Sequence, residues 1–97
     1  MLRLRMDGRV KKALLAKIQE TISNTDEISS IQQMLYRIPV TSQDDFVFGI
    51  AIGRIYNSFH YQTRRALKRN ATKEEFAEFL DILANRAGAI RIALKPQ

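Results

Sequence analysis

Cysteine is absent from this sequence, and histidine occurs only once. The lack of cysteine excludes disulfides, thiolate nucleophiles and cysteine metal sites, and a single histidine leaves little for a histidine-based site. Long apolar runs are also missing: the longest extends from Phe46 to Ile52, far short of the roughly 20 residues that a membrane-spanning helix needs. The charged start of the chain is followed by no apolar segment of the kind that a secretory signal requires. We therefore expect a cytoplasmic protein that does not cross a membrane.

What the sequence does contain is an excess of positive charge. Sixteen Lys and Arg against ten Asp and Glu give a net charge of +6. This balance favours polyanionic partners without identifying one. A length of 97 residues and a hydrophobic fraction of 45% are typical of one folded globule, so residues 1–97 are expected to form a single domain.

Apolar residues recur every three or four positions in the first 38 residues, which is the spacing of one helix face. A first helix is expected over residues 7–23, with basic side chains on its other face. A second helix is expected over residues 25–38. Asn24 is its predicted N-cap, with Glu27 as the reciprocal acid, and Pro39 ends it.

The third predicted helix, over residues 43–70, is the longest and the most central. Ser42 is its expected N-cap, with Asp45 at the third position. Its first half is apolar nearly all round, which is typical of a helix buried on several sides, whereas its second half is polar and basic. A break into two helices at Asn57 and Ser58 is the alternative, because both residues are weak helix formers.

A capping box predicts where the last helix begins. Thr72 and Glu75 form the box, the helix is expected over residues 72–94, and Asn70 is expected to take the left-handed conformation that ends the preceding helix. In a competing interpretation, Gly88 ends the last helix and residues 90–94 form a short strand beside residues 2–5. The favoured fold class is all-α, a four-helix single domain with a long central third helix.

Two glycines lie on one side of the apolar half of the third helix. Gly49 and Gly53 are four residues apart, and glycine inside a helix costs about 1 kcal/mol relative to alanine. Their spacing predicts close approach by another helix, within the chain or across a dimer interface. They do not form a phosphate-binding loop, because the lysine and hydroxyl residue of such a loop are absent.

Positive charge is concentrated in two stretches of the chain. Residues 1–20 carry six basic and two acidic side chains, residues 54–69 carry five basic and no acidic ones, and the remainder is net negative. Lysine and arginine neutralise phosphates, and an exposed aromatic ring stacks on unpaired bases. The alternative is a solvated basic face that pairs with the acids of the last helix. We expect nucleic-acid contacts, with DNA and RNA not distinguished, at Arg9, Lys11, Lys12, Tyr61, Arg64, Arg65, Lys68 and Arg69.

Catalysis and metal binding have less support. His60 has no acid nearby in the sequence to orient it as a general base. The acidic residues gather in the first turns of the predicted helices, where the helix dipole stabilises carboxylates without any metal. No catalytic residue, metal ligand or cofactor is therefore expected.

The expected function is that of a small non-enzymatic nucleic-acid-binding protein with a basic face on its first and third helices. The alternative is a helical protein-protein interaction module, a homodimer or adaptor, with no nucleic-acid role. A third alternative attaches the first helix to anionic membrane surfaces, which requires Leu14, Leu15 and Ile18 to be exposed.

Overall fold

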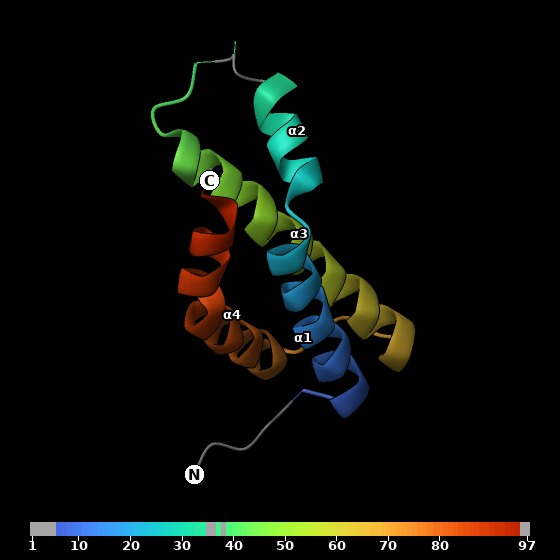
Figure 1. Cartoon of the computed structure of the whole chain (residues 1–97). Helices are drawn as coiled ribbons and strands as arrows, with labels where there is room; N and C mark the ends of the chain where they lie inside the picture. Colours follow the sequence, from blue (N-terminus) through green and yellow to red (C-terminus); the bar gives the residue numbers. More distant parts are fainter. Residues whose placement is uncertain (1–5, 35–36, 38, 96–97) are drawn as a thin grey trace.

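The fold is built around one long helix. The computed structural model describes residues 6–34, 37 and 39–95. Within these ranges it has no strand and four helices, α1 (Gly8–Ser23), α2 (Asp26–Met34), α3 (Gln43–Leu67) and α4 (Lys73–Leu94) (Figure 1). The three other helices all pack against α3, and α1 also contacts α4. The all-α fold class and its long central third helix are confirmed.

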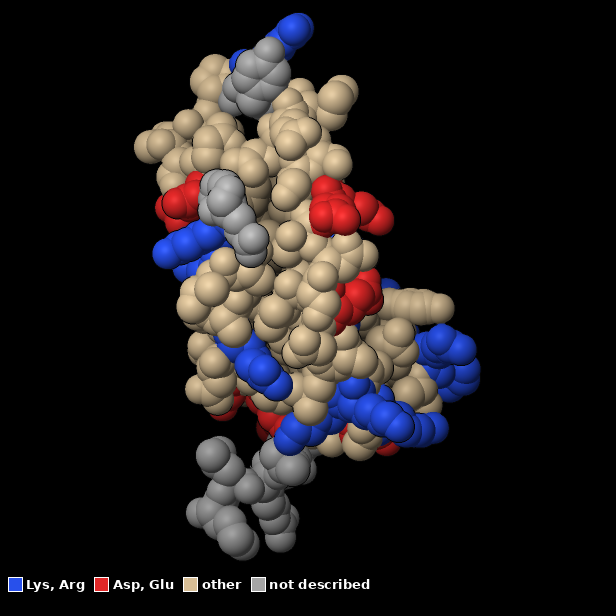
Figure 2. All heavy atoms as spheres, in the orientation of Figure 1, with Lys and Arg blue, Asp and Glu red and all other residues tan. Residues whose placement is uncertain are grey.

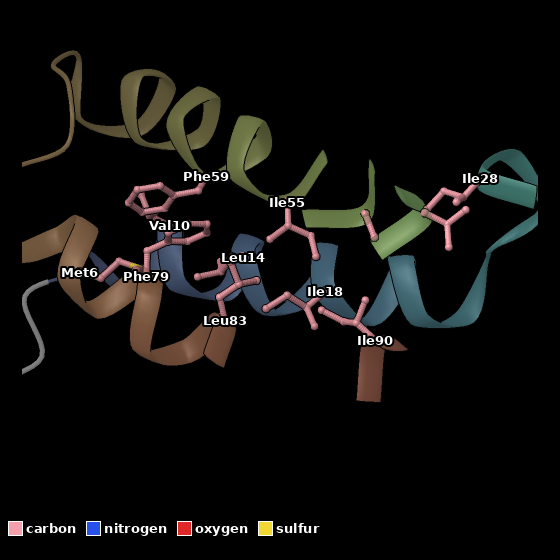
Figure 3. Packing of buried hydrophobic residues seen from close by; sticks show 12 residues of the cluster. Met6, Val10, Leu14, Ile18, Ile28, Ile55, Phe59, Phe79, Leu83 and Ile90 are labelled. Atoms are coloured by element: carbon pink, nitrogen blue, oxygen red, sulfur yellow. The ribbon is translucent and has the colours of Figure 1, made fainter. Parts of the chain in front are cut away.

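The core lies where α1, α3 and α4 meet. On α1 and α3 the buried positions recur every three or four residues, so each helix presents one largely apolar stripe to the others. Phe59 of α3 and Phe79 of α4 stack with their ring centroids 4.5 Å apart (Figure 3). The buried apolar residues are Met6, Val10, Leu14, Ile18, Ile28, Val47, Ala51, Ile55, Phe59, Phe79, Leu83 and Ile90.

Attachment of α1 to a membrane surface would require its apolar side chains to be exposed, and they are not. Leu14 and Ile18 are buried, and Leu15 is half-buried, so the apolar face of α1 faces the core. None of the helices in the described ranges combines the length and apolar character needed to cross a bilayer.

Several predicted helix signals are confirmed. Ser42 accepts a hydrogen bond from the Asp45 N–H at 3.2 Å, and the Thr72 and Glu75 box is closed in both directions. α3 is continuous through Asn57 and Ser58. α4 continues through Gly88, so residues 90–94 are helical and the strand interpretation is wrong. The proposed strand partner, residues 2–5, lies outside the described residues.

The junction between α1 and α2 differs from the prediction. Asn24 ends α1, where its N–H donates to the Glu20 carbonyl at 2.9 Å. The Thr25 carbonyl accepts the first hydrogen bond of α2, from the Ser29 N–H at 2.9 Å. Asparagine is favourable at either end of a helix, so its presence alone did not decide between the two roles. α2 ends at Met34 and Arg37 lies in a turn, whereas residues 35, 36 and 38 of the predicted last turn lie outside the described residues.

The end of α3 also differs. The helix ends at Leu67, and Lys68 takes the left-handed conformation expected for Asn70, with φ 58° and ψ 30°. Directly after this turn, the Arg69 guanidinium donates to the Asn70 carbonyl at 2.9 Å and to the Glu75 carboxylate at 2.8 Å. The early end of α3 thus lets Arg69 reach the first turn of α4.

Candidate nucleic-acid interface

Two adjoining hollows lie along the seam between α1 and α3. The hollow nearer the start of α1 has a volume of about 400 Å³ and is lined by Arg9, Val10, Gln62, Arg65, Ala66 and Lys68. The second has a volume of about 420 Å³ and is lined by Lys17, Arg54, Asn57, Ser58 and Tyr61. We call the two hollows together the α1–α3 groove.

Helical spacing explains why these residues converge. The core positions Ile55 and Phe59 fix the rotation of α3, so the residues beside them stand at the rim of its contact with α1. Arg9 and Lys17 are eight residues apart on α1, about two turns, and therefore share the side of α1 that borders the groove. On α3 the same side carries residues three or four apart, namely Arg54, Ser58, Tyr61, Gln62 and Arg65.

Five cations line the groove, and they differ in their partners. Arg65 and Lys68 have no ion pair with any residue in the described part of the chain, whereas Arg9 Nε lies 3.2 Å from Asp7 Oδ1. Lys17 Nζ and Arg54 Nη2 lie 3.4 and 3.7 Å from the carboxylate oxygens of Glu20, which is exposed. Positive charge therefore exceeds negative charge along the groove.

Figure 2 shows where basic side chains gather on one face of the molecule. Lys and Arg gather at the lower right of the view, over the region where Figure 1 shows the start of α1 and the end of α3. These two segments are separated by more than fifty positions in the sequence. The basic cluster is therefore a product of the packing of α1 against α3.

The eight predicted contact residues fall into three groups. Arg9, Tyr61, Arg65 and Lys68 line the groove. Lys12 and Arg64 are exposed outside its lining, without an ion pair to any described residue. The remaining two pair with α4, and they are Lys11 and Arg69.

These two pairs match the alternative expectation that basic residues neutralise the acids of the last helix. Lys11 Nζ lies 3.8 Å from Glu78 Oε2. Arg69 donates to both carboxylate oxygens of Glu75, and this pairing lowers the pKa of the Glu75 carboxyl from its ordinary value. Burial opposes the shift, and a hydrogen bond from the Thr72 N–H adds to it. Lys11 and Arg69 thus hold α4 against the rest of the fold.

Lys17 and Arg54 are groove residues that the sequence analysis did not place in the site. A signal for both is present in the helical spacing. Arg54 precedes Tyr61 by seven residues, and Lys17 follows Arg9 by eight, so each lies two turns from a predicted contact residue.

Gly49 and Gly53 lie on an exposed side of α3. A Cβ atom added at either position would meet no atom of the described residues within 4 Å. The predicted close approach of a helix from within the chain is therefore not found among the described residues. An approach across a dimer interface stays a prediction.

His60 lies in the aromatic packing between α3 and α4. Its ring centroid is 4.7 Å from that of Tyr56 in an edge contact and 5.9 Å from that of Phe76 in a stacked one. Both contacts belong to the packing of α3 against α4. No group of three or more His, Asp and Glu side chains that could hold a metal ion occurs in the described ranges.

The groove thus offers guanidinium and ammonium groups, side-chain amides and hydroxyls, and one aromatic ring in two open hollows along the contact of α1 with α3. Such groups bind phosphate oxygens and base edges. Comparison of the chain with family models, with curated proteins and with solved structures finds no match.

Proposed function

We propose that this chain is a small non-enzymatic nucleic-acid-binding protein of the cytoplasm, which holds backbone phosphates in the α1–α3 groove. The observation that carries the proposal is the convergence of five cations from two distant segments of the sequence on one groove. They are Arg9, Lys17, Arg54, Arg65 and Lys68.

The distribution of ion pairs supports a ligand for these cations. Lys11 and Arg69 are neutralised by the carboxylates of α4, but Arg65 and Lys68 have no such partner among the described residues. Gathered like charges repel one another and destabilise the fold. A polyanion that neutralises them releases its own counterions, and this release drives binding.

The length of the groove favours a polymeric anion over a small one. Arg54 lies in α3 and Lys68 directly follows the end of that helix, fourteen residues further along, which corresponds to about 21 Å at 1.5 Å per residue. This span exceeds a single phosphate group and suits a chain of several. The groove is also open, so a strand can pass along it without entering a closed pocket.

Binding is tested by fluorescence anisotropy with labelled DNA and RNA oligonucleotides, single-stranded and duplex. The groove variant combines Arg65→Gln with Lys68→Gln. The control variant combines Arg86→Gln with Lys95→Gln, two exposed residues outside the groove lining, and loses the same charge. Because two phosphate contacts are lost, we expect the groove variant to bind roughly 20- to 60-fold more weakly at about 0.1 M salt. The control variant should change affinity by about threefold or less.

Two results would contradict the proposal. One is the absence of binding to every oligonucleotide at low salt. The other is an equal loss of affinity in the groove and control variants, which would mean that net charge alone, and not the groove, attracts the nucleic acid.

A homodimer or adaptor built on the exposed side of α3 is the second candidate function. The observation that favours it is the open space beside Gly49 and Gly53, which leaves room for a helix of another molecule. Light scattering tests it: a dimer that is lost on Gly53→Leu, in a protein without affinity for nucleic acid, would establish this candidate in place of the first.

A further inference from the structure

Two tyrosines of α3 have the same exposure and different surroundings. Tyr56 is 47% exposed and Tyr61 is 48% exposed. The Tyr56 ring makes edge contacts with His60, Phe76 and Phe79 and so belongs to the packing of α3 against α4. The Tyr61 ring contacts no other ring within the part of the chain that the structure describes. Contacts between rings therefore tie Tyr56 to α4, and the described residues offer no such contact to the Tyr61 ring.

The place of Tyr61 in the groove distinguishes it from an ordinary surface tyrosine. It lines the same hollow as Lys17 and Arg54. Arg65 follows it by one helical turn and lines the neighbouring hollow. An aromatic ring is thus flanked by cations on both sides along the groove.

Polar side chains with free hydrogen-bonding capacity surround the ring. Asn57 and Ser58 share its hollow, and Gln62 lines the next one. None of the three makes a side-chain hydrogen bond with another described residue. Amides and hydroxyls of this kind contact base edges as well as phosphates.

We propose that the groove takes single-stranded nucleic acid in preference to duplex, with the Tyr61 ring as the platform for one unpaired base. This inference rests on the proposed function. In a duplex, neighbouring base pairs cover the faces of each base, so the ring adds nothing to the phosphate contacts. In a single strand a base face is free to stack on the ring, and the cations on either side hold the phosphates that flank it.

Variants of Tyr61 separate stacking from charge. Tyr61→Phe keeps the aromatic face, and Tyr61→Leu removes it while leaving every cation in place. For single-stranded DNA or RNA of mixed sequence, we expect Tyr61→Phe to bind like the original protein and Tyr61→Leu to bind about 5- to 150-fold more weakly. Duplex of the same sequence should bind both variants and the original protein with equal affinity. Thermal unfolding controls for folding, and it should change little because about half of Tyr61 is exposed and Leu keeps an apolar side chain at this position.

Intrinsic fluorescence gives a second, direct readout. The chain has three tyrosines and no tryptophan, so tyrosine emission is observed without interference. Single-stranded oligonucleotides should quench this emission in the original protein, and should quench it much less in Tyr61→Leu.

The possible results distinguish a failure of the stacking inference from a failure of the proposed function. If the groove variant Arg65→Gln with Lys68→Gln binds weakly but Tyr61→Leu binds single strands like the original protein, the stacking inference is overturned and the proposed function stands. If Tyr61→Leu lowers the affinity for single strands and for duplex equally, the stacking inference is also overturned and the proposed function stands. If the original protein binds neither form at low salt, both proposals fail together.

Discussion

Arg69 holds Glu75 with both arms of its guanidinium: Nη1 lies 2.8 Å from Oε1 and Nη2 lies 3.1 Å from Oε2. The same carboxylate accepts the Thr72 N–H at 2.7 Å, so one buried side chain joins the end of α3 to the start of α4. Two charge-assisted bonds in parallel are stronger than a single contact. The Arg69 guanidinium therefore pairs with a carboxylate of the protein itself, although its place in a basic stretch of the sequence predicted a phosphate contact.

This pair predicts how stability depends on pH. Arg69 lowers the pKa of Glu75 in the folded protein below its ordinary value of 4.5, chiefly through the side-chain hydrogen bonds. The contribution of Glu75 to the free energy of unfolding is therefore complete above about pH 4.5 and is lost as the pH falls through the folded pKa. Glu75→Gln keeps a side chain that can close the capping box but has no charge to lose. Urea unfolding should show the variant to be less stable at neutral pH, with a smaller further loss in acid. Parallel losses in the two proteins below about pH 4.5 would disprove this role.

Glu20 predicts a gain of function. Its carboxylate lies within 3.7 Å of Lys17 and Arg54 and competes with phosphates for both cations. We expect Glu20→Gln to raise affinity for nucleic acid about two- to fivefold at low salt, with a change in unfolding free energy of about 1 kcal/mol or less, because exposed ion pairs contribute little. The measurement is an anisotropy titration beside Asp81→Asn, which removes an exposed carboxylate from α4. Equal gains in the two variants would show that Glu20 has no specific effect.

Gly53 predicts a gain of stability. An alanine methyl group at this position meets nothing within 4 Å in the part of the chain that the structure describes, and alanine is favoured over glycine in a helix interior by about 1 kcal/mol. Gly53→Ala should therefore raise the free energy of unfolding by about 0.5–1 kcal/mol and leave nucleic-acid binding unchanged. Thermal unfolding tests the gain of stability, and light scattering on the same samples reports the oligomeric state. Destabilisation together with loss of an oligomer would show instead that Gly53 lies in an interface between copies.

The parts of the fold that depend on local patterns could be predicted from the sequence. The Thr72 and Glu75 capping box requires only two residues at a fixed spacing, and the predicted last helix agrees with α4 to within one residue at its start. The end of α3 could not be predicted in this way. Lys68 takes a left-handed conformation that is unfavourable for lysine, and it does so next to an ion pair between two helices.

The positive charge of the site could be predicted from the sequence, but the residues that line the groove could not. The basic stretches of α1 and α3 are visible in the sequence. Which neighbouring helix each of their side chains contacts, however, depends on how the helices pack. Lys11 pairs with Glu78 on α4, whereas Lys17, six residues further along the same helix, lines the groove beside Arg54. Which cations pair internally and which remain for a ligand therefore depends on how the helices are rotated about their axes.

The dependence of affinity on salt tests the central claim most directly. If the five groove cations each neutralise one phosphate, the slope of log affinity against log salt should be about −3.5 for single strands and about −4.5 for duplex. The Arg65→Gln and Lys68→Gln variant should reduce the magnitude of this slope by about 1.5, whereas Arg86→Gln with Lys95→Gln should leave it unchanged. A slope near zero, or a slope that is the same in both variants and the original protein, would contradict the assignment of phosphate binding to the α1–α3 groove.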